Sequence, residues 1–148
     1  MIAVQRAFPV APVLALAGVA AWLASGMITQ PALALHLSTA VGALVLGGVI
    51  LWRSKGTGSH RLLGRVWVAL MSTAALSSFW LTGLSEGFSV IHLLSVWTLV
   101  ALALAIYFVR KGDVKSHKRF MTGTFLGLAG AGIGALMPGR TLFVLFLG

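Results

Sequence analysis

Long apolar stretches alternate with short polar ones along the whole of this 148-residue sequence. The apolar runs cover about residues 10–27, 33–52, 60–84, 88–109 and 117–138. At a rise of about 1.5 Å per helical residue, each is long enough to cross a hydrocarbon core of about 30 Å. The runs lack the short alternating segments of barrel strands. The pattern therefore predicts an all-α protein, a polytopic transmembrane helix bundle with five spans.

Composition supports this prediction. The chain is 59% hydrophobic and 9% charged, whereas soluble domains carry about 25% charged residues. We expect a single transmembrane domain over 1–148, with the first helix at about 10–27. That run could also act as a signal peptide behind Arg6, but it is long for that role and is expected to remain as a helix. The apolar tail at 141–148 is too short to span.

The distribution of charge predicts a topology. The formal net charge is +9, and ten of the eleven basic residues fall on one side of the predicted bundle. The positive-inside rule then places the N-terminus and both basic loops in the cytoplasm and the C-terminus outside. The expected partner of the basic residues is the lipid bilayer and not nucleic acid.

Two stretches of the chain resemble each other. His36 opens an apolar run that ends in a basic loop, followed by His60 after 24 residues; His92 opens a second such run, followed by His117 after 25 residues. The repeats cover about 33–84 and 88–137. Short loops make each repeat an antiparallel helical hairpin, so we expect the two to form a four-helix core with the first helix outside it.

The repeat predicts histidine pairs near the two membrane surfaces. His36 and His92 lie at one level, and His60 and His117 at the other. A b-type haem needs one imidazole on each side of its plane, so the four rings could ligate two haems. Four basic residues near the second level could pair with haem propionates or with anionic lipid instead: Arg61, Arg65, Lys118 and Arg119.

Other readings of these residues remain open. Ser59 and Ser116 look like helix N-caps, which would leave His60 and His117 close to water as plain interfacial residues. The glycines of 42–48 and 123–134 could give a porphyrin room, although close helix packing explains the latter group more simply. The five tryptophans fit aromatic belts near the interfaces.

Further catalytic chemistry is poorly supported. Glu86 and Asp113 are the only carboxylates and fall on opposite predicted faces, so they cannot form an acid–base pair. The sequence shows no hydrolytic or transferase constellation. A zinc site needs three or four protein ligands close together, whereas each predicted face of the bundle offers two histidines. With no cysteines, disulfides and Fe–S clusters are excluded, and redox chemistry would need a bound cofactor.

Two segments resemble a known family. HRLLGRVW at 60–67 and GDVKSHKRFM at 112–121 are similar to the two signatures of small bacterial membrane proteins grouped as domain of unknown function 2306. The resemblance covers about 33–140 and implies a multi-pass inner-membrane protein. A more distant, architectural resemblance is to the dihaem cytochrome b-561 type, which also pairs histidines of its second and fourth, and third and fifth, helices.

The sequence thus favours a b-type cytochrome-like membrane protein that exchanges electrons with a quinone or another redox partner. Two alternatives remain: a cofactor-free accessory or structural subunit of a larger membrane complex, and a pigment-binding accessory subunit.

Overall fold

The computed structural model describes residues 31–81 and 90–138, and over these residues it is all-helical. The elements are α2 (Pro31–Trp52), α3 (Gly58–Ser77), the 3₁₀ turn η1 (Ser78–Trp80), α4 (Val90–Arg110) and α5 (Val114–Ala135). The prediction of an all-α protein is confirmed for this part of the chain. The first helix expected at 10–27 and the tail at 141–148 lie outside the described residues.

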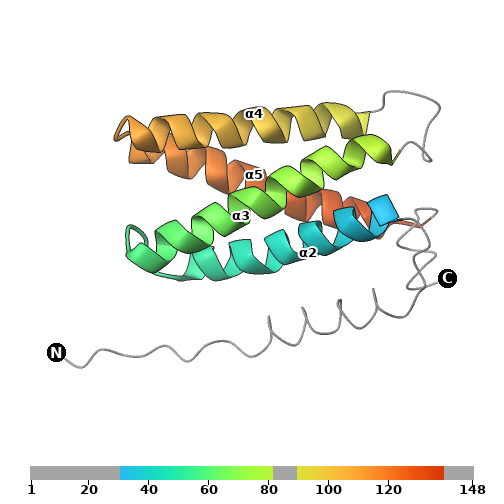
Figure 1. Ribbon diagram of the computed structural model, residues 1–148, viewed down its shortest axis with the longest axis horizontal. Helices are drawn as coiled ribbons and strands as arrows, with labels where there is room; N and C mark the ends of the chain where they lie inside the picture. The colour runs from blue at the N-terminus through green and yellow to red at the C-terminus, as the bar shows by residue number, and fades with distance from the viewer. Residues whose placement is uncertain (1–30, 82–89, 139–148) are drawn as a thin grey trace.

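The four helices form two antiparallel hairpins that pack side by side (Figure 1). Helix α2 packs against α3, and α4 packs against α5. Helix α3 also contacts α4, and α2 contacts α5, so each helix has two neighbours around the bundle. Consequently α2 lies opposite α4, and α3 lies opposite α5. We call the end that carries the turns 53–57 and 111–113 the basic end, and the opposite one the far end.

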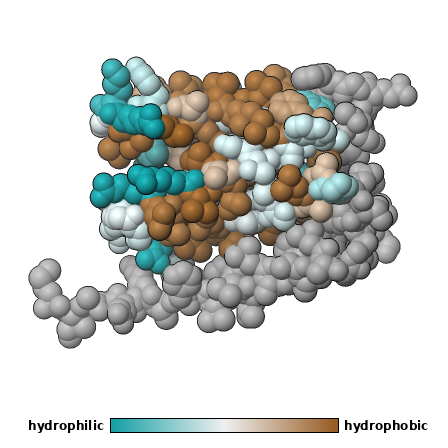
Figure 2. Space-filling view, viewed as in Figure 1, coloured by the Kyte–Doolittle hydropathy of each residue, from teal (hydrophilic) through white to brown (hydrophobic). Residues whose placement is uncertain are grey.

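Three of the described helices are long and apolar enough to cross a membrane: Pro31–Trp52, Gly58–Trp80 and His92–Arg110. Helix α5 is less apolar than these three. It has three basic residues in its first two turns and several glycines further along. The number of five spans therefore remains a prediction. Figure 2 shows apolar side chains over the middle of the bundle and most of the hydrophilic ones at the basic end.

The turns of the two hairpins are built alike. Gly56 and Gly112 adopt positive φ values of 80° and 82°, which glycine adopts without a steric cost. The next residue in each turn is the helix N-cap. Thr57 accepts a hydrogen bond from the backbone N–H of His60, and Asp113 accepts one from Ser116.

These caps correct the prediction that Ser59 and Ser116 are the N-caps. The true caps lie two and three residues earlier, because Thr57 and Asp113 directly follow the glycines that turn the chain. His60 and His117 consequently lie about one turn inside their helices and not at the first helical position. The caps predicted at Ser59 and Ser116 would have made both histidines the first helical residues, which is wrong, but both still lie in about the first turn.

The Asp113 cap makes a pH-dependent contribution to stability. Hydrogen bonds from the Ser116 hydroxyl and backbone N–H lower the pKa of this exposed carboxyl. A lowered folded-state pKa means that the carboxylate stabilises the fold above about pH 4 and that this contribution is lost as pH falls through the folded pKa. We expect the thermal midpoint in detergent to decrease as the pH falls below about 4, and to decrease less in Asp113→Asn. As a control, Thr57→Ala removes the uncharged cap and should lower the thermal midpoint equally at all pH values. If wild type and Asp113→Asn lost stability equally in acid, the pH-dependent role of the Asp113 cap would be contradicted.

A small core lies between the helices. Ala43, Trp67, Met71 and Leu102 are buried together, and Phe125 of α5 packs against them. The indole N–H of Trp67 donates to the carbonyl of Ala43 at 2.8 Å. This hydrogen bond satisfies the buried indole and fixes α3 against α2. The prediction that Trp67 belongs to an interfacial belt is therefore wrong, whereas Trp52, Trp80 and Trp97 are exposed.

The glycines of α2 and α5 differ in how closely other side chains approach them. A Cβ added at Gly47 would lie 2.6 Å from Phe125 and 2.7 Å from the Trp67 indole nitrogen, so α2 approaches both rings through bare backbone. A Cβ at Gly123, Gly127, Gly130 or Gly134 would meet nothing within 4 Å. The expected close packing of helices through the α5 glycines is thus not found among the described residues, because that stripe faces away from the other three helices.

Candidate functional site

The helices carry the four histidines to the two ends of the bundle. His36 near the start of α2 and His92 near the start of α4 lie at the far end, while His60 of α3 and His117 of α5 lie at the basic end. Each pair comes from helices on opposite sides of the bundle. At about 1.5 Å per residue, about 21 Å of α3 separates His60 from Ala74, which His36 contacts.

His36 is held by the last turn of α3. Its Nδ1 lies 2.9 Å from the carbonyl oxygen of Ala74 and 3.3 Å from the hydroxyl of Ser77. A carbonyl oxygen can only accept, so Nδ1 carries the hydrogen, and the lone pair of the neutral ring is on Nε2. The bond fixes both the tautomer and the ring orientation.

His117 is held in the same way at the other end. Its Nδ1 lies 2.9 Å from the carbonyl oxygen of Ala105, a fully buried residue of α4. Here too Nδ1 donates and Nε2 keeps its lone pair. Metal-ligating histidines almost always donate their second ring N–H to a carbonyl, a carboxylate or water, because this orients the ring and raises its basicity.

His60 has a buried ring nitrogen without a partner. Its Nδ1 is inaccessible to solvent and accepts or donates no hydrogen bond within the described structure. Buried polar atoms normally have a partner, and an orphan of this kind calls for an explanation.

His92 is the most buried of the four, with 5% of its surface exposed. Its ring centroid lies 5.7 Å from that of Phe79 in η1. One turn further along α4, the hydroxyl of Ser95 bonds to that of Ser78 at 2.7 Å. His36 and His92 thus both contact the segment where α3 passes into η1.

The basic residues predicted for propionate pairing are all exposed and lie at the basic end. Arg61 and Arg65 are one turn apart on α3, next to His60. Lys118 and Arg119 follow His117 on α5 and line a depression on the outer side of that helix.

The arrangement places two histidines at each level. Within residues 31–81 and 90–138, no three His, Cys, Asp or Glu side chains gather as a metal-binding group. Structural zinc takes four protein ligands and catalytic zinc three, whereas a haem iron takes two axial ones. The donor set fits haem better than zinc.

Sequence reasoning missed the groups that orient these rings. The acceptors are backbone carbonyls of two alanines, Ala74 and Ala105, and no sequence pattern marks a carbonyl as an acceptor. The hydroxyl contact between Ser78 and Ser95 was also not predicted, although two serines in apolar runs are a signal that could have suggested it.

Comparison with known proteins places the chain in a family. Neither curated proteins nor solved structures include a match, so the resemblance to the cytochrome b-561 type stays an interpretation. The family model described as "Predicted membrane protein (DUF2306)" matches residues 33–146. This range contains α3, α4, α5, all but the first two residues of α2, and all four histidines, and it confirms the family assignment made from the two signatures. The chain belongs to the DUF2306 family of membrane proteins.

Proposed function

We propose that this protein is an integral-membrane b-type cytochrome-like electron carrier with two bis-histidine haem sites. The observation that carries the proposal is the pair of bonds from Nδ1 of His36 and His117 to backbone carbonyls at 2.9 Å. These bonds leave Nε2 of each ring as a lone-pair donor held in a fixed orientation, and metal-ligating histidines usually donate their other ring N–H to an acceptor in this way.

Each residue has a distinct part in this proposal. His36 and His92 would be the axial ligands at the far end, and His60 and His117 those at the basic end. Ligation would give a role to the half-buried ring of His60, whose buried Nδ1 has no hydrogen-bond partner in the described structure. Arg61 and Arg65, exposed beside His60, would pair with carboxylates of the cofactor. Bound haem b would supply a one-electron redox couple at each level.

The duplicated hairpin belongs to the same proposal. The two turns share a positive-φ glycine followed directly by the capping residue, and Gly56 and Gly112 have the same separation along the chain as His36 and His92. A repeated hairpin would place equivalent ligands on opposite helices of the bundle, once near each surface.

We place the protein in the bacterial inner membrane, with the basic end and the N-terminus in the cytoplasm. The two histidine levels are separated by about 21 Å of helix. Electron transfer between haems at these levels would therefore cross most of the apolar core. A quinone or a soluble redox protein is the expected donor, and the acceptor would lie at the opposite surface.

An absorption spectrum of the protein purified in detergent tests the proposal. We expect a Soret band and, after dithionite reduction, sharp α and β bands of a six-coordinate b-type haem, with about two haems per chain by pyridine haemochrome assay. A variant with all four histidines replaced by alanine serves as the control for haem held in the micelle.

The other outcomes separate the alternatives. A folded protein that binds no haem when expressed with excess haem precursor would overturn the proposal in favour of a cofactor-free accessory subunit. A far-red band would point to a chlorophyll-type pigment. Equal haem in wild type and the four-histidine variant would show binding unrelated to these residues.

A further inference from the structure

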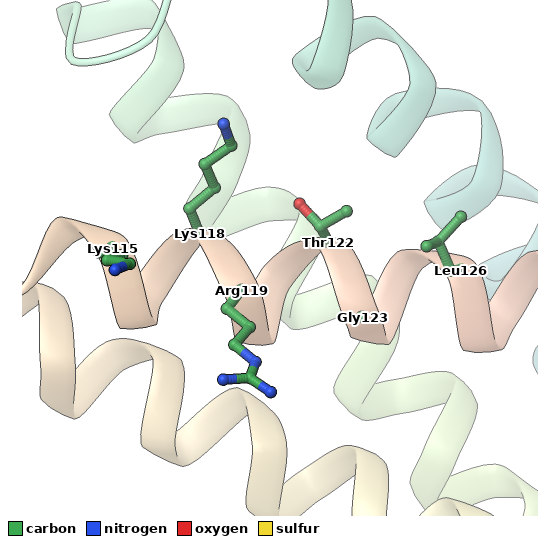
Figure 3. A pocket seen from close by; sticks show the side chains of 6 residues that line it. All are labelled: Lys115, Lys118, Arg119, Thr122, Gly123 and Leu126. Atoms are coloured by element: carbon green, nitrogen blue, oxygen red, sulfur yellow. The ribbon is translucent and has the colours of Figure 1, made fainter.

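A depression on the outer side of α5 combines basic and apolar side chains. It measures about 440 Å³, is open to the surroundings, and is lined by Lys115, Lys118, Arg119, Thr122, Gly123 and Leu126. Figure 3 shows Lys118, Thr122 and Leu126 along one edge of the helix and Arg119 on the other, with Gly123 one turn further along from Arg119. Lys115 lies at the end nearest the turn 111–113.

The lining residues change in character along the helix. The three cations occupy the first two turns of α5, next to the turn 111–113 at the basic end, and Thr122, Gly123 and Leu126 follow towards the middle of the helix. A phospholipid at a membrane surface has the same order, with a charged phosphate at the level of the headgroups and acyl chains below it. The basic part of the depression thus lies at the depth of the lipid phosphate, and its apolar part lies at the depth of the acyl chains.

The cations of this depression have no acidic partner in the described structure. The chain has eleven basic residues against two acidic ones. Asp113, the carboxylate nearest in sequence, accepts the Ser116 N–H as the N-cap of α5 and does not line the depression. An anion that balances Lys115, Lys118 and Arg119 must therefore come from outside this part of the chain.

The apolar half has room for a chain of methylene groups. A Cβ at Gly123 would meet no atom within 4 Å, so a neighbouring molecule can lie directly against the helix backbone there. Leu126, which is 62% exposed, extends the apolar surface by one turn. Close approach at glycine increases the van der Waals contact, which is the main attraction between apolar groups inside a bilayer.

We propose that this depression binds an anionic phospholipid. Lys118 and Arg119 would hold the phosphate, with Lys115 beside it, and one acyl chain would lie along Gly123 and Leu126. The site is independent of haem, because no histidine lines the depression. The proposal assigns Lys118 and Arg119 to lipid in preference to haem propionates.

Native mass spectrometry of the full chain in detergent, titrated with phosphatidylglycerol, measures this binding. The double variant Lys118→Gln/Arg119→Gln should weaken binding about thirtyfold, because each cation near a membrane surface contributes about 1 kcal/mol. The matched control is Arg110→Gln/Lys111→Gln, which removes the same charge at the same end from residues outside the depression. It should leave the dissociation constant nearly unchanged, and phosphatidylcholine should bind weakly to all three proteins.

A second variant distinguishes a lipid from a free phosphate ion. Gly123→Leu adds a side chain into open space, so the fold tolerates it while the apolar half of the depression is filled. It should weaken phosphatidylglycerol binding without changing the binding of inorganic phosphate. Equal losses in both double variants would show general surface electrostatics and overturn the proposal. Unchanged phosphatidylglycerol binding in Gly123→Leu would also overturn it, in favour of a simple anion site.

Discussion

Replacing His92 with alanine is expected to remove about half of the bound haem, because one of two axial ligands at the far end is lost while both ligands at the basic end remain. The same loss is expected for His117→Ala at the basic end. The double variant should then bind almost none. Haem per chain, measured by pyridine haemochrome assay on detergent-purified protein, checks this prediction.

The pairing is tested more sharply by combining variants. His36→Ala together with His92→Ala should lose no more haem than either alone, since both would empty the same site, whereas His60→Ala with His92→Ala should lose both haems. Thr124→Ala is a suitable control, because it removes a buried hydroxyl that bonds to Phe120 of its own helix. Unchanged haem in a folded His92→Ala protein would rule out the pairing, and elution as a monodisperse peak verifies folding.

Substitution of Gly47 by alanine is expected to cause a large loss of stability. The added Cβ would lie 2.6 Å from Phe125 and 2.7 Å from the indole nitrogen of Trp67. Trp67 cannot move aside without breaking its 2.8 Å hydrogen bond to Ala43. Overpacking of this kind costs about 1–3 kcal/mol, and with two rings closer than 3 Å we expect a cost near the upper end, well above the gain of about 1 kcal/mol from the higher helix propensity of alanine.

The neighbouring glycine provides the control for this substitution. A Cβ at Gly48 would meet nothing within 4 Å, so Gly48→Ala should keep or slightly raise the stability. Unfolding of both variants in mixed micelles of dodecyl maltoside and SDS, followed by tryptophan fluorescence, compares them directly. Equal midpoints for Gly47→Ala and Gly48→Ala would contradict the close approach of α2 to Trp67 and Phe125.

Several features of the fold were predictable because they depend on residues close together in the sequence. Continuous apolar runs and short basic loops specify helices and turns, and the C-terminal ends of α2 and α4 lie within one residue of the predicted ones. The signatures at 60–67 and 112–121 were sufficient to identify the family. The helix caps were missed by two or three residues, since both serines and the true caps, Thr57 and Asp113, have side chains that can cap a helix.

The candidate site was predictable only in outline. The spacing of the histidines placed His36 and His92 at one end and His60 and His117 at the other. It could not reveal that His36 donates to Ala74, that His117 donates to Ala105, or that the Nδ1 of His60 has no partner. Such contacts depend on how each helix is rotated about its axis and on which helices become neighbours.

The sequence by itself thus determined the helical class, the hairpin turns, the family and the level of each histidine in the bundle. These properties follow from hydropathy and spacing within one span, which are local. Only the tertiary structure decided the order of helices around the bundle, the burial of Trp67 against α2 and the outward position of the α5 glycines. The reason is that every side of an apolar helix looks alike in sequence, and packing between distant segments selects the side that faces inward.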